Sequence, residues 1–419
     1  MNVAVARRET CRLCDSPEVK LVVNLNPVPL AEKYTSHPDE ARQAPRFPID
    51  LYMCRDCSHV QLLDVINSKD LWNDYTYHSG QTRGIVEHFQ EVSQKVIAKY
   101  SPQPGSLVVD IGSNDGSLLR CFKEVGYAVH GVDPAREIAE KATASGIPTT
   151  PALFTAEIAD QIRAKDGRAS IISAFNVFAH ADNLGAMADA IRSLLTDDGI
   201  FMFEVQYLAD IVDKVLIGTI FHEHMSHHSL KPMIQFLAAH GMELIDVERV
   251  SIQKGSIIGY AQLKGSPRQI APAVGEMLRQ EQERKLDQIV VMEEFNQRIE
   301  KNRAVARALA EEWKKQGYVI AGYGAARSGP TLMAQFEFDQ IIQFIFDDHP
   351  QKVNRFSPGN GVPVLPTTEL MNKKPNVVII LAWIHARAII EKSQDYLAAG
   401  GQFVICTPDV RVIDKDHPL

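Results

Sequence analysis

The stretch SLVVDIGSNDGSLLRCF at residues 106–122 decides the fold of the middle of this chain. Its apolar run Leu107–Ile111 predicts a buried strand, Gly112 and Gly116 predict a turn, and the residues that follow predict a helix. Such a turn exposes backbone N–H groups that can bind the polar groups of a ligand. Because the glycines do not follow the G-x-G-x-x-G spacing, the turn does not match a dinucleotide fingerprint.

The segments that follow extend this unit into a larger α/β domain. YAVHGVDP (127–134) predicts a strand that ends in Asp133, about 20 residues after Gly112, where a carboxylate can accept hydrogen bonds from ribose hydroxyls. IISAFNVFAH (171–180) and GIFMFEVQ (199–206) supply the fourth and fifth strands. Together they resemble the adenosyl-binding half of class I methyltransferases that use S-adenosylmethionine; a βαβ unit that binds no ligand is the alternative. The resemblance implies a cofactor site formed by Asp110, Gly112, Asn114, Asp115, Gly116, Asp133 and Asn176.

After residue 267 the chain changes character. Residues 272–317 form a long charged helical stretch, and its apolar positions predict a packing surface formed by Ile289, Met292, Ile299, Leu309 and Trp313. YVIAGYGAARSGPTL (318–332) then repeats the strand–turn–helix plan, and FIFDDHP and VVIILAW add strands, so a second doubly wound α/β domain is predicted. Its turn combines backbone N–H groups with Arg327, which suits a pyrophosphate. One domain is then available for a methyl donor and the other for a substrate nucleotide.

Six cysteines are placed unevenly, and four of them form two C-x-x-C pairs. In a reducing cytosol, two such pairs indicate one zinc site rather than disulfides. Four thiolates leave no open coordination position on a tetrahedral ion, so the zinc is expected to be structural. The predicted ligands are Cys11, Cys14, Cys54 and Cys57, with a small β-rich insert between the pairs; four unrelated thiols are the alternative.

Composition indicates a globular protein with more than one domain. At 419 residues the chain is too long for one ordinary core, and 45% hydrophobic and 23% charged residues are typical of globular proteins. A net charge of −8 provides no general attraction to nucleic acid or to anionic membranes. No apolar run approaches the roughly 20 residues that span a bilayer, and MNVAVARRETC lacks a secretion signal. We expect a cytoplasmic monomer that binds neither nucleic acid nor membranes.

An ordered set of motifs makes a closer resemblance. The set comprises the two C-x-x-C pairs, YTYHSG (75–80), DIGSNDGSLL (110–119), the HEH segment (222–224), GYGAARSG (322–329) and VNRFSPGNGVPV (353–364). Over nearly the whole chain it resembles the sugar C-methyltransferases that act on nucleotide-linked 4-keto-deoxysugars in branched-sugar biosynthesis. The resemblance implies an α/β protein of three domains: a small β-rich zinc-binding domain (1–72), a class I methyltransferase Rossmann-like domain (73–267), and a linker helix with a C-terminal Rossmann-like domain that binds the sugar nucleotide (268–419).

The resemblance also implies roles at the substrate. His224 is the expected base, Glu223 its partner, and Tyr75 or Tyr77 a further polar group at the sugar, with His222 next in line as a catalytic residue. A dTDP- or GDP-linked sugar is expected to contact Tyr77, His78, Ser79, Gly324, Arg327, Ser328, Asn354, Arg355, Trp383 and His385. Methylation at C3 is expected rather than at C5, with S-adenosylmethionine as the donor and no catalytic metal.

The segment GTIFHEHMSHHS (218–229) holds four histidines, and three kinds of site could use them. A zincin H-E-x-x-H motif would need histidine where Ser226 stands, which disfavours a second metal. A polar loop at a helix start is the structural alternative. Acid–base chemistry is preferred, because histidine titrates near neutral pH and a carboxylate can orient it. Methylation at carbon requires a base, since a carbon beside a carbonyl becomes nucleophilic when it loses a proton.

Two positions beside the HEH segment depart from the family pattern. Phe221 stands where the family usually has a tyrosine before this segment, and His227 replaces the tyrosine that commonly follows. Because Phe221 cannot donate a hydrogen bond, either His222 or His227 takes that role, or the substrate differs, or the reaction is slow. Two other functions stay open: an O- or N-methyltransferase of a small metabolite, and a non-catalytic zinc- and nucleotide-binding scaffold.

Overall fold

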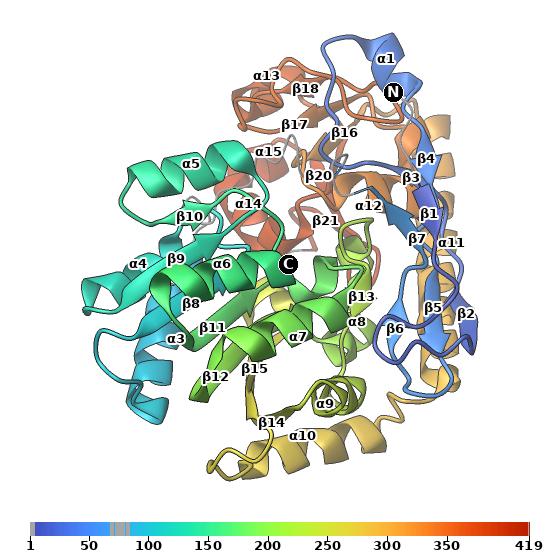
Figure 1. Ribbon diagram of the computed structural model, residues 1–419. Helices are drawn as coiled ribbons and strands as arrows, with labels where there is room; N and C mark the ends of the chain where they lie inside the picture. Colours follow the sequence, from blue (N-terminus) through green and yellow to red (C-terminus); the bar gives the residue numbers. More distant parts are fainter. Residues whose placement is uncertain (1–4, 68–70, 72–79, 81–83, 418) are drawn as a thin grey trace.

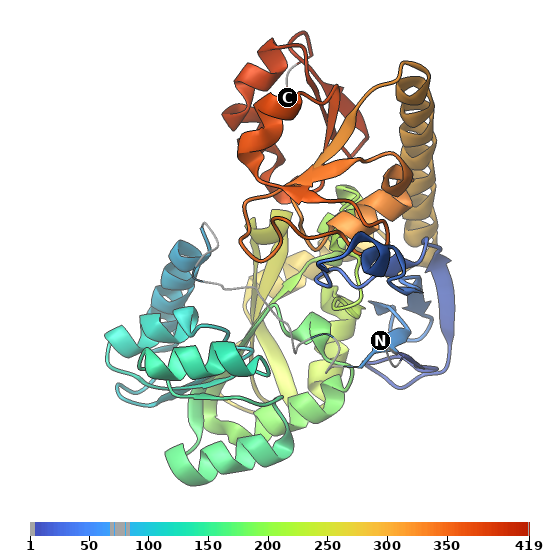
Figure 2. The same ribbon diagram turned by 90° about the horizontal axis from the view of Figure 1, so that it is seen from above.

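The computed structural model describes residues 5–67, 71, 80, 84–417 and 419. The described residues form the predicted α/β fold, with a β-rich N-terminal region, a central sheet and a C-terminal sheet. Two views show the C-terminal sheet apart from the central one, with the N-terminal strands beside the long helix α11 (Ile289–Lys315) (Figures 1 and 2).

The central sheet has seven strands among the described residues, in the order β10-β9-β8-β11-β12-β15-β14. The first five are parallel, and β15 runs antiparallel to both of its neighbours. Leu107–Ile111 forms β8 and is buried throughout, as a strand of a parallel sheet covered on both faces requires. The elements of this region are α3 (Ile85–Tyr100), β8 (Leu107–Ile111), α4 (Ser117–Glu124), β9 (Ala128–Val132), α5 (Arg136–Ala144), β10 (Thr149–Thr150), α6 (Ala156–Asp166), β11 (Ala169–Phe175), η2 (Phe178–His180), α7 (Leu184–Leu194), β12 (Leu195–Gln206), α8 (Leu208–Asp213), η3 (Ile217–Thr219), β13 (Ser226–His227), α9 (Leu230–Ala239), β14 (Met242–Val250), η4 (Ile252–Lys254) and β15 (Ser256–Leu263).

The largest sheet of the N-terminal region includes a strand, β13, that comes from the central part of the sequence. This sheet has the order β13-β6-β5-β2, and β13 pairs with β6 through Ser226 opposite Gln61 and His227 opposite Val60. The residues just after His224 are therefore part of the N-terminal sheet. The elements of the N-terminal region are β1 (Val5–Arg7), β2 (Val19–Val23), β3 (Val28–Pro29), α1 (Pro38–Arg42), β4 (Arg46–Phe47), β5 (Leu51–Cys54), β6 (Val60–Gln61) and β7 (Asp64–Ile66).

The C-terminal sheet has the order β18-β17-β16-β19-β20-β21 and is parallel except for β21. The charged stretch before it forms two helices rather than one. The chain turns between them because Lys285 has a φ of 55° and Leu286 is buried. The elements are α10 (Pro272–Glu283), α11 (Ile289–Lys315), β16 (Ile320–Tyr323), α12 (Gly329–Gln335), η5 (Phe338–Gln340), β17 (Phe344–Phe346), β18 (Val364–Leu365), η6 (Thr367–Glu369), α13 (Leu370–Lys373), β19 (Val377–Ile380), η7 (Trp383–His385), α14 (Ala386–Lys392), α15 (Gln394–Ala398), β20 (Gln402–Ile405) and β21 (Arg411–Ile413).

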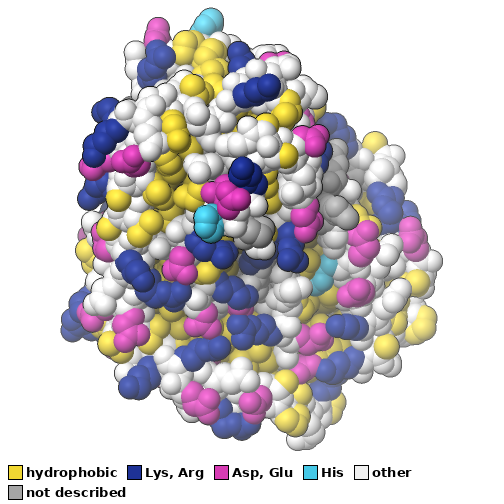
Figure 3. All heavy atoms as spheres, turned by 180° about the vertical axis from the view of Figure 1, so that it is seen from behind, with side chains coloured by type: hydrophobic (Ala, Val, Ile, Leu, Met, Phe, Trp, Pro, Cys, Tyr) yellow, Lys and Arg dark blue, Asp and Glu magenta, His cyan; other side chains and the backbone are white. Residues whose placement is uncertain are grey.

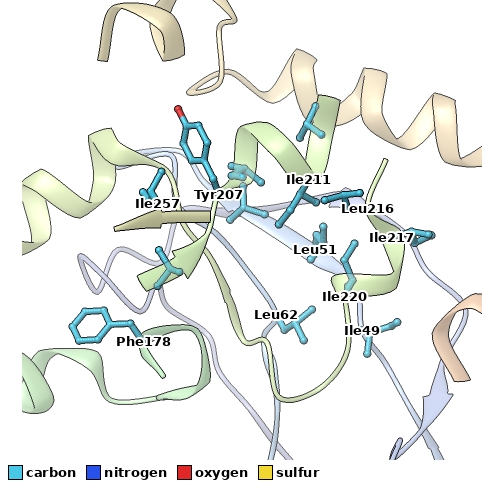
Figure 4. Packing of buried hydrophobic residues seen from close by; sticks show 14 of the residues in the cluster. Ile49, Leu51, Leu62, Phe178, Tyr207, Ile211, Leu216, Ile217, Ile220 and Ile257 are labelled. Atoms are coloured by element: carbon cyan, nitrogen blue, oxygen red, sulfur yellow. The ribbon is translucent and has the colours of Figure 1, made fainter. Parts of the chain in front are cut away.

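One hydrophobic core runs from the N-terminal region into the central one. In Figure 4, Ile49, Leu51 and Leu62 of the N-terminal region lie close to Ile217 and Ile220, and all five are almost fully buried. Burial of an aliphatic side chain contributes about 1.5–3 kcal/mol, so this contact stabilises the chain just before the HEH segment.

The surface carries both signs of charge. Lys and Arg side chains are interspersed with Asp and Glu over the face drawn in Figure 3. In the part of the chain that the structure describes, no helix combines the length and the apolar character that crossing a membrane would require.

Candidate active site

The glycine turn after β8 lies very close to the end of β11. Gly112 and Gly116 have φ of 70° and 77°, in the left-handed region that favours glycine. A Cβ at Gly112 would lie 2.3 Å from Val177 Cγ2, so a larger residue would displace the segment that follows β11. The turn therefore leaves its backbone open at the carboxyl ends of the strands, where ligands of open α/β sheets bind.

Two buried carboxylates stand at this turn. Asp133 accepts backbone N–H bonds from Asn114 and Ala135, both at 2.8 Å, and burial raises its pKa. Asp110 accepts a hydrogen bond from Ser173 Oγ at 2.6 Å, and burial raises its pKa to about 7. Carboxylate oxygens have further lone pairs, so both groups can still accept hydrogen bonds from hydroxyl or ammonium groups of S-adenosylmethionine.

The described end of the YTYHSG segment reaches the same turn. Gly80 N–H donates to Asp115 Oδ2 at 2.8 Å, and Asp115 Oδ1 accepts from Ser117 Oγ at 2.6 Å. Asp115 therefore joins the turn to the segment that carries the predicted sugar contacts. The predicted residues Tyr75, Tyr77, His78 and Ser79 lie outside the described residues.

Asn176, directly after β11, is hydrogen-bonded to a buried glutamate, Glu204, which belongs to none of the sequence motifs. Its Nδ2 donates to Glu204 Oε1 at 3.1 Å, and Glu204 Oε2 lies 2.5 Å from His88 Nε2. Because its amide nitrogen is engaged, Asn176 keeps its amide oxygen as the acceptor for a ligand. The signal for Glu204 in the sequence is a single acid within the apolar strand FMFEV.

His224 is held in one tautomer. Its Nδ1 lies 2.7 Å from the carbonyl oxygen of Thr219. Since a carbonyl only accepts hydrogen bonds, Nδ1 carries the proton and Nε2 is unprotonated. Burial lowers the pKa of His224 to about 4, so the ring is neutral at physiological pH. His224 is therefore prepared to accept a proton at Nε2.

A small cavity of about 10 Å³ is bordered by both His224 and the predicted cofactor residue Asn176. It is lined by Asn176, Ala179, His180, Val205, Gln206, His224 and Ser226. The His180 and Phe221 rings lie 5.0 and 4.0 Å from the His224 ring, measured between centroids. The structure thus brings the predicted cofactor residue Asn176 and the predicted base His224 to the same cavity. The sequence does not predict a role for His180, and its place at the end of the loop FNVFAH that follows β11 is the available signal.

Two neighbours of His224 in the HEH segment have other partners. His222 Nε2 lies 3.3 Å from Phe47 O in the N-terminal region. Burial raises the pKa of Glu223, and the charge of Arg327 partly opposes that shift. The group at His224 Nδ1 is the Thr219 carbonyl rather than the carboxylate of Glu223.

The later histidines of the segment lie in the N-terminal sheet and its surroundings. His227 belongs to β13, and the His228 ring lies 5.4 Å from that of His59. Burial lowers the pKa of His227 to about 3 and that of His228 to about 4. Among the described residues, the only group of three or more close metal-binding side chains is the cysteine cluster.

Arg327 of the C-terminal domain is paired with the N-terminal region. Its Nε lies 3.5 Å from Glu32 Oε1, and Lys352 Nζ lies 3.0 Å from Glu32 Oε2. An anionic ligand at Arg327 would therefore meet two cations and compete with one carboxylate. Neither Glu32 nor Lys352 belongs to a sequence motif that would predict its place beside Arg327.

The other predicted substrate residues are spread around the same end of the C-terminal sheet. Ser328 and Trp383 are buried, and Ser328 Oγ donates to Leu381 O at 2.8 Å. Gly324 has a φ of 96°, and a Cβ there would lie 2.3 Å from Ala382 Cβ. The exposed members of the set are Asn354, Arg355 and His385.

The four predicted zinc ligands form one cluster. The Sγ atoms of Cys11, Cys14, Cys54 and Cys57 all lie within 4.8 Å of one another. Cys11 and Cys57 are 3.5 Å apart, and Cys14 and Cys54 are 3.6 Å apart. A tetrahedral ion with Zn–S bonds of about 2.3 Å places its thiolates about 3.8 Å apart, so this donor set fits structural zinc.

Three family models match successive parts of the chain. Residues 11–72 match the family described as "Putative zinc binding domain", residues 85–247 match "Methyltransferase domain", and residues 251–408 match "C-methyltransferase C-terminal domain". The protein thus has the fold of an S-adenosylmethionine-dependent methyltransferase, joined to a zinc-binding domain with four cysteines.

One relative is similar to this protein over almost the whole chain. The C-methyltransferase NovU of Streptomyces niveus is 32% identical over 412 residues, which are 98% of this chain and 98% of the relative. The protein described here belongs to this C-methyltransferase family.

Solved structures align with less than half of the chain. Magnesium protoporphyrin IX methyltransferase from Synechocystis PCC 6803, with bound S-adenosylhomocysteine, is 19% identical and covers 47% of this chain and 92% of its own, with a TM-score of 0.35. The CcbJ methyltransferase from Streptomyces caelestis is 13% identical and covers 47% of this chain and 96% of its own, with a TM-score of 0.34.

Replacing Asp133 by Ala is expected to weaken S-adenosylmethionine binding by about 1–3 kcal/mol, because the variant removes the charged acceptor that is predicted for the ribose. Asp133→Asn is the more conservative variant, since it removes the charge, keeps one acceptor oxygen for the turn and replaces the other oxygen by an NH2 donor. Calorimetric titration with S-adenosylmethionine measures both variants, and unchanged affinity in Asp133→Ala would move the ribose site elsewhere.

Proposed function

We propose that this protein is an S-adenosylmethionine-dependent C-methyltransferase of a nucleotide-linked 4-keto-deoxysugar, and that it methylates C3 rather than C5. The observation that carries the proposal is the fixed orientation of His224, whose Nδ1 donates to the Thr219 carbonyl and leaves Nε2 unprotonated, beside a small cavity that Asn176 also lines. Transfer to carbon needs such a base, whereas a scaffold would need none. Asp110, Asp115, Asp133 and Asn176 would hold the cofactor at the glycine turn.

The proposed chemistry divides between the ligands and the chain. S-adenosylmethionine supplies an electrophilic methyl group when it is bound. His224 Nε2 takes the proton from the carbon beside the ketone, and the C–H electron pair moves onto the ketone oxygen to give an enolate. The enolate carbon would then form the new bond to the methyl group while the methyl–sulfur bond breaks. The sulfur would keep that electron pair and leave as neutral S-adenosylhomocysteine, and the ketone would re-form. The chain contributes the base, the alignment of the two ligands and the exclusion of water.

Product analysis tests this proposal. The protein would be incubated with S-adenosylmethionine and a panel of dTDP- and GDP-linked 4-keto-6-deoxysugars, and the products examined by mass spectrometry and NMR. A new methyl group on C3 is the expected result, and a methyl group on C5 would correct the position. A methyl group on oxygen would overturn carbon methylation, and binding of both ligands without any product would support a scaffold.

The nucleotide part of the substrate is proposed to bind through Arg327. Arg327→Ala should weaken a nucleoside diphosphate by about 1–3 kcal/mol, the scale of a lost hydrogen bond to a charged group, while S-adenosylmethionine binds as before. Glu32→Gln is the complementary variant, because it removes the carboxylate that now pairs with Arg327. Calorimetry with the free diphosphate measures both; equal affinity in Arg327→Ala and the parent would place the diphosphate elsewhere.

The pH dependence follows from the burial of His224. A base is active when unprotonated, so the rate is lost only as pH falls through its pKa, which burial lowers to about 4. We expect kcat/KM for the sugar nucleotide to stay flat between about pH 5 and 8. S-adenosylmethionine should be saturating, because Asp110 at its site has a pKa of about 7. An acid limb centred near pH 6.5 would indicate a solvated base instead.

A further inference from the structure

The chain that carries His224 is also held by the C-terminal domain. Thr331 Oγ1 donates to the carbonyl oxygen of Ile220 at 2.8 Å, and both residues are fully buried. Nearby, a Cβ at Gly218 would lie 2.5 Å from Trp383 Nε1, so the backbone of η3 lies directly against Trp383. The two carbonyl groups of Thr219 and Ile220 thus face different partners: His224 in the cavity and Thr331 in the C-terminal domain.

Thr331 belongs to a helix that is fixed at its other end. All residues of α12 (Gly329–Gln335) are buried. Gln335 Oε1 accepts a hydrogen bond from Asn26 N, and its Nε2 donates to Asn26 O, both at 2.8 Å. Arg303 Nε of α11 donates to Gln335 O at 3.1 Å. Because the helix is anchored in this way, the Thr331 hydroxyl is a fixed point against which the HEH segment is placed.

We propose that Thr331 is a positioning residue for the base, and this rests on the proposed role of His224. Its hydrogen bond to Ile220 sets the orientation of the peptide groups at 219–221. That orientation keeps the Thr219 carbonyl on His224 Nδ1, which in turn leaves Nε2 as the proton acceptor. Thr331 follows Arg327 by four positions, so the part of the chain proposed to bind the diphosphate and the part that orients the base are joined through α12.

The consequence of losing this bond concerns geometry more than binding. Without the Thr331 hydroxyl, the buried Ile220 carbonyl loses its partner and the peptide can rotate to find another. The Thr219 carbonyl would then leave His224 Nδ1, and the ring could adopt the tautomer with the proton on Nε2. A His224 ring in that tautomer cannot accept a proton from the substrate, so turnover falls while both ligands still bind.

Thr331→Val tests the proposal, because valine has the shape of threonine without the hydroxyl. ¹⁵N NMR of histidine-labelled full-length protein reports the tautomer of His224, whose signal is assigned by its loss in His224→Gln. We expect a single Nδ1–H tautomer in the parent and a mixture in Thr331→Val. With the sugar nucleotide, kcat should fall about 10-fold and KM should change less than about 2-fold, the scale of one lost hydrogen bond. Thr331→Ser, which keeps the hydroxyl, should restore both the tautomer and kcat.

Tyr396→Phe is the matched control. It also removes a buried hydroxyl that donates to a carbonyl of the C-terminal domain, Pro375 O at 3.0 Å, but it does not contact the segment at 217–224. It should lower Tm without changing the His224 tautomer or kcat. Gly218→Ala, which presses on Trp383, disturbs the same backbone by another route and should also mix the tautomers.

The proposal is overturned if Thr331→Val keeps the parent tautomer and kcat, or if it behaves like Tyr396→Phe and changes Tm alone. The tautomer is measured without substrate, so its outcome is separate from that of the proposed function. A parent protein that methylates no ketosugar, but whose His224 tautomer depends on Thr331, would retain the positioning role and lose only the proposed substrate.

Discussion

His224→Ala is expected to lose about 10²–10⁴ in turnover, the usual contribution of a general base, while both ligands bind with nearly unchanged affinity. The reason is that the variant removes the unprotonated Nε2 and leaves the glycine turn and Arg327 intact. Single-turnover rates with the ketosugar substrate measure the chemical step, and calorimetry with each ligand measures binding.

Two further variants separate a catalytic role from a packing role. His222→Ala removes a neighbouring buried imidazole that contacts Phe47 O, and it should lower Tm with a much smaller loss of rate. Phe221→Tyr adds a hydroxyl to the ring that lies 4.0 Å from His224, and it should preserve or raise the rate. In deuterated water the parent should exchange the proton beside the ketone, and His224→Ala should not.

Normal methylation by His224→Ala would move the base to another residue. Tyr75, Tyr77 and His222 are next in line from the sequence, and His180 joins them because its ring lies 5.0 Å from that of His224. The same rate and exchange measurements on variants of those four residues would identify the base.

Features that depend on residues close together in the sequence could be predicted from local patterns. Gly112 and Gly116 have the positive φ that a tight strand–helix turn requires, and the two C-x-x-C pairs meet in one cluster. The acid that directly follows β9, Asp133, likewise belongs to the same βαβ unit as the glycine turn. Such features need no knowledge of distant contacts, so one sequence suffices to predict them.

Contacts that depend on how the chain turns back on itself or packs against a distant segment could not be predicted in the same way. Glu223 is adjacent to His224 in sequence, and yet the Thr219 carbonyl occupies Nδ1, because the turn at 219–224 brings that carbonyl back to the ring. Arg327 faces Glu32, which lies almost 300 positions earlier, through packing of the first and last regions. Spacing along the chain carries no information on either contact.

The helical stretch at 272–317 shows the same limit at a smaller scale. Its apolar periodicity correctly placed Met292, Ile299 and Trp313 in the core. The periodicity does not predict the break between α10 and α11, where Lys285 has a φ of 55° and Leu286 is buried.

Cys54→Ser is expected to remove most of the zinc and to unfold the N-terminal region. Structural zinc contributes about 10–16 kcal/mol of apparent binding free energy in small zinc domains, and that energy is coupled to folding. Cys54 lies in β5, in the middle of the sheet that zinc would hold against Cys11, Cys14 and Cys57. Zinc analysis of the purified protein and its thermal unfolding measure the effect, with Cys121→Ser as the control at a cysteine outside the cluster.

The loss of zinc should also lower the rate of methyl transfer, because the N-terminal region positions the chain around His224. Arg12, which lies between Cys11 and Cys14 in the sequence, is buried. It donates from Nη1 to Met225 O at 3.2 Å and from Nε to Asp182 Oδ1 at 3.0 Å. Met225 directly follows His224, and Asp182 lies two positions after His180. A displacement of about 1 Å at a reacting group can cost about 10²-fold in rate, so Cys54→Ser should lose turnover on that scale although no cysteine contacts the substrate. A purified parent without metal, or a Cys54→Ser protein with normal zinc content, stability and rate, would contradict a structural zinc site.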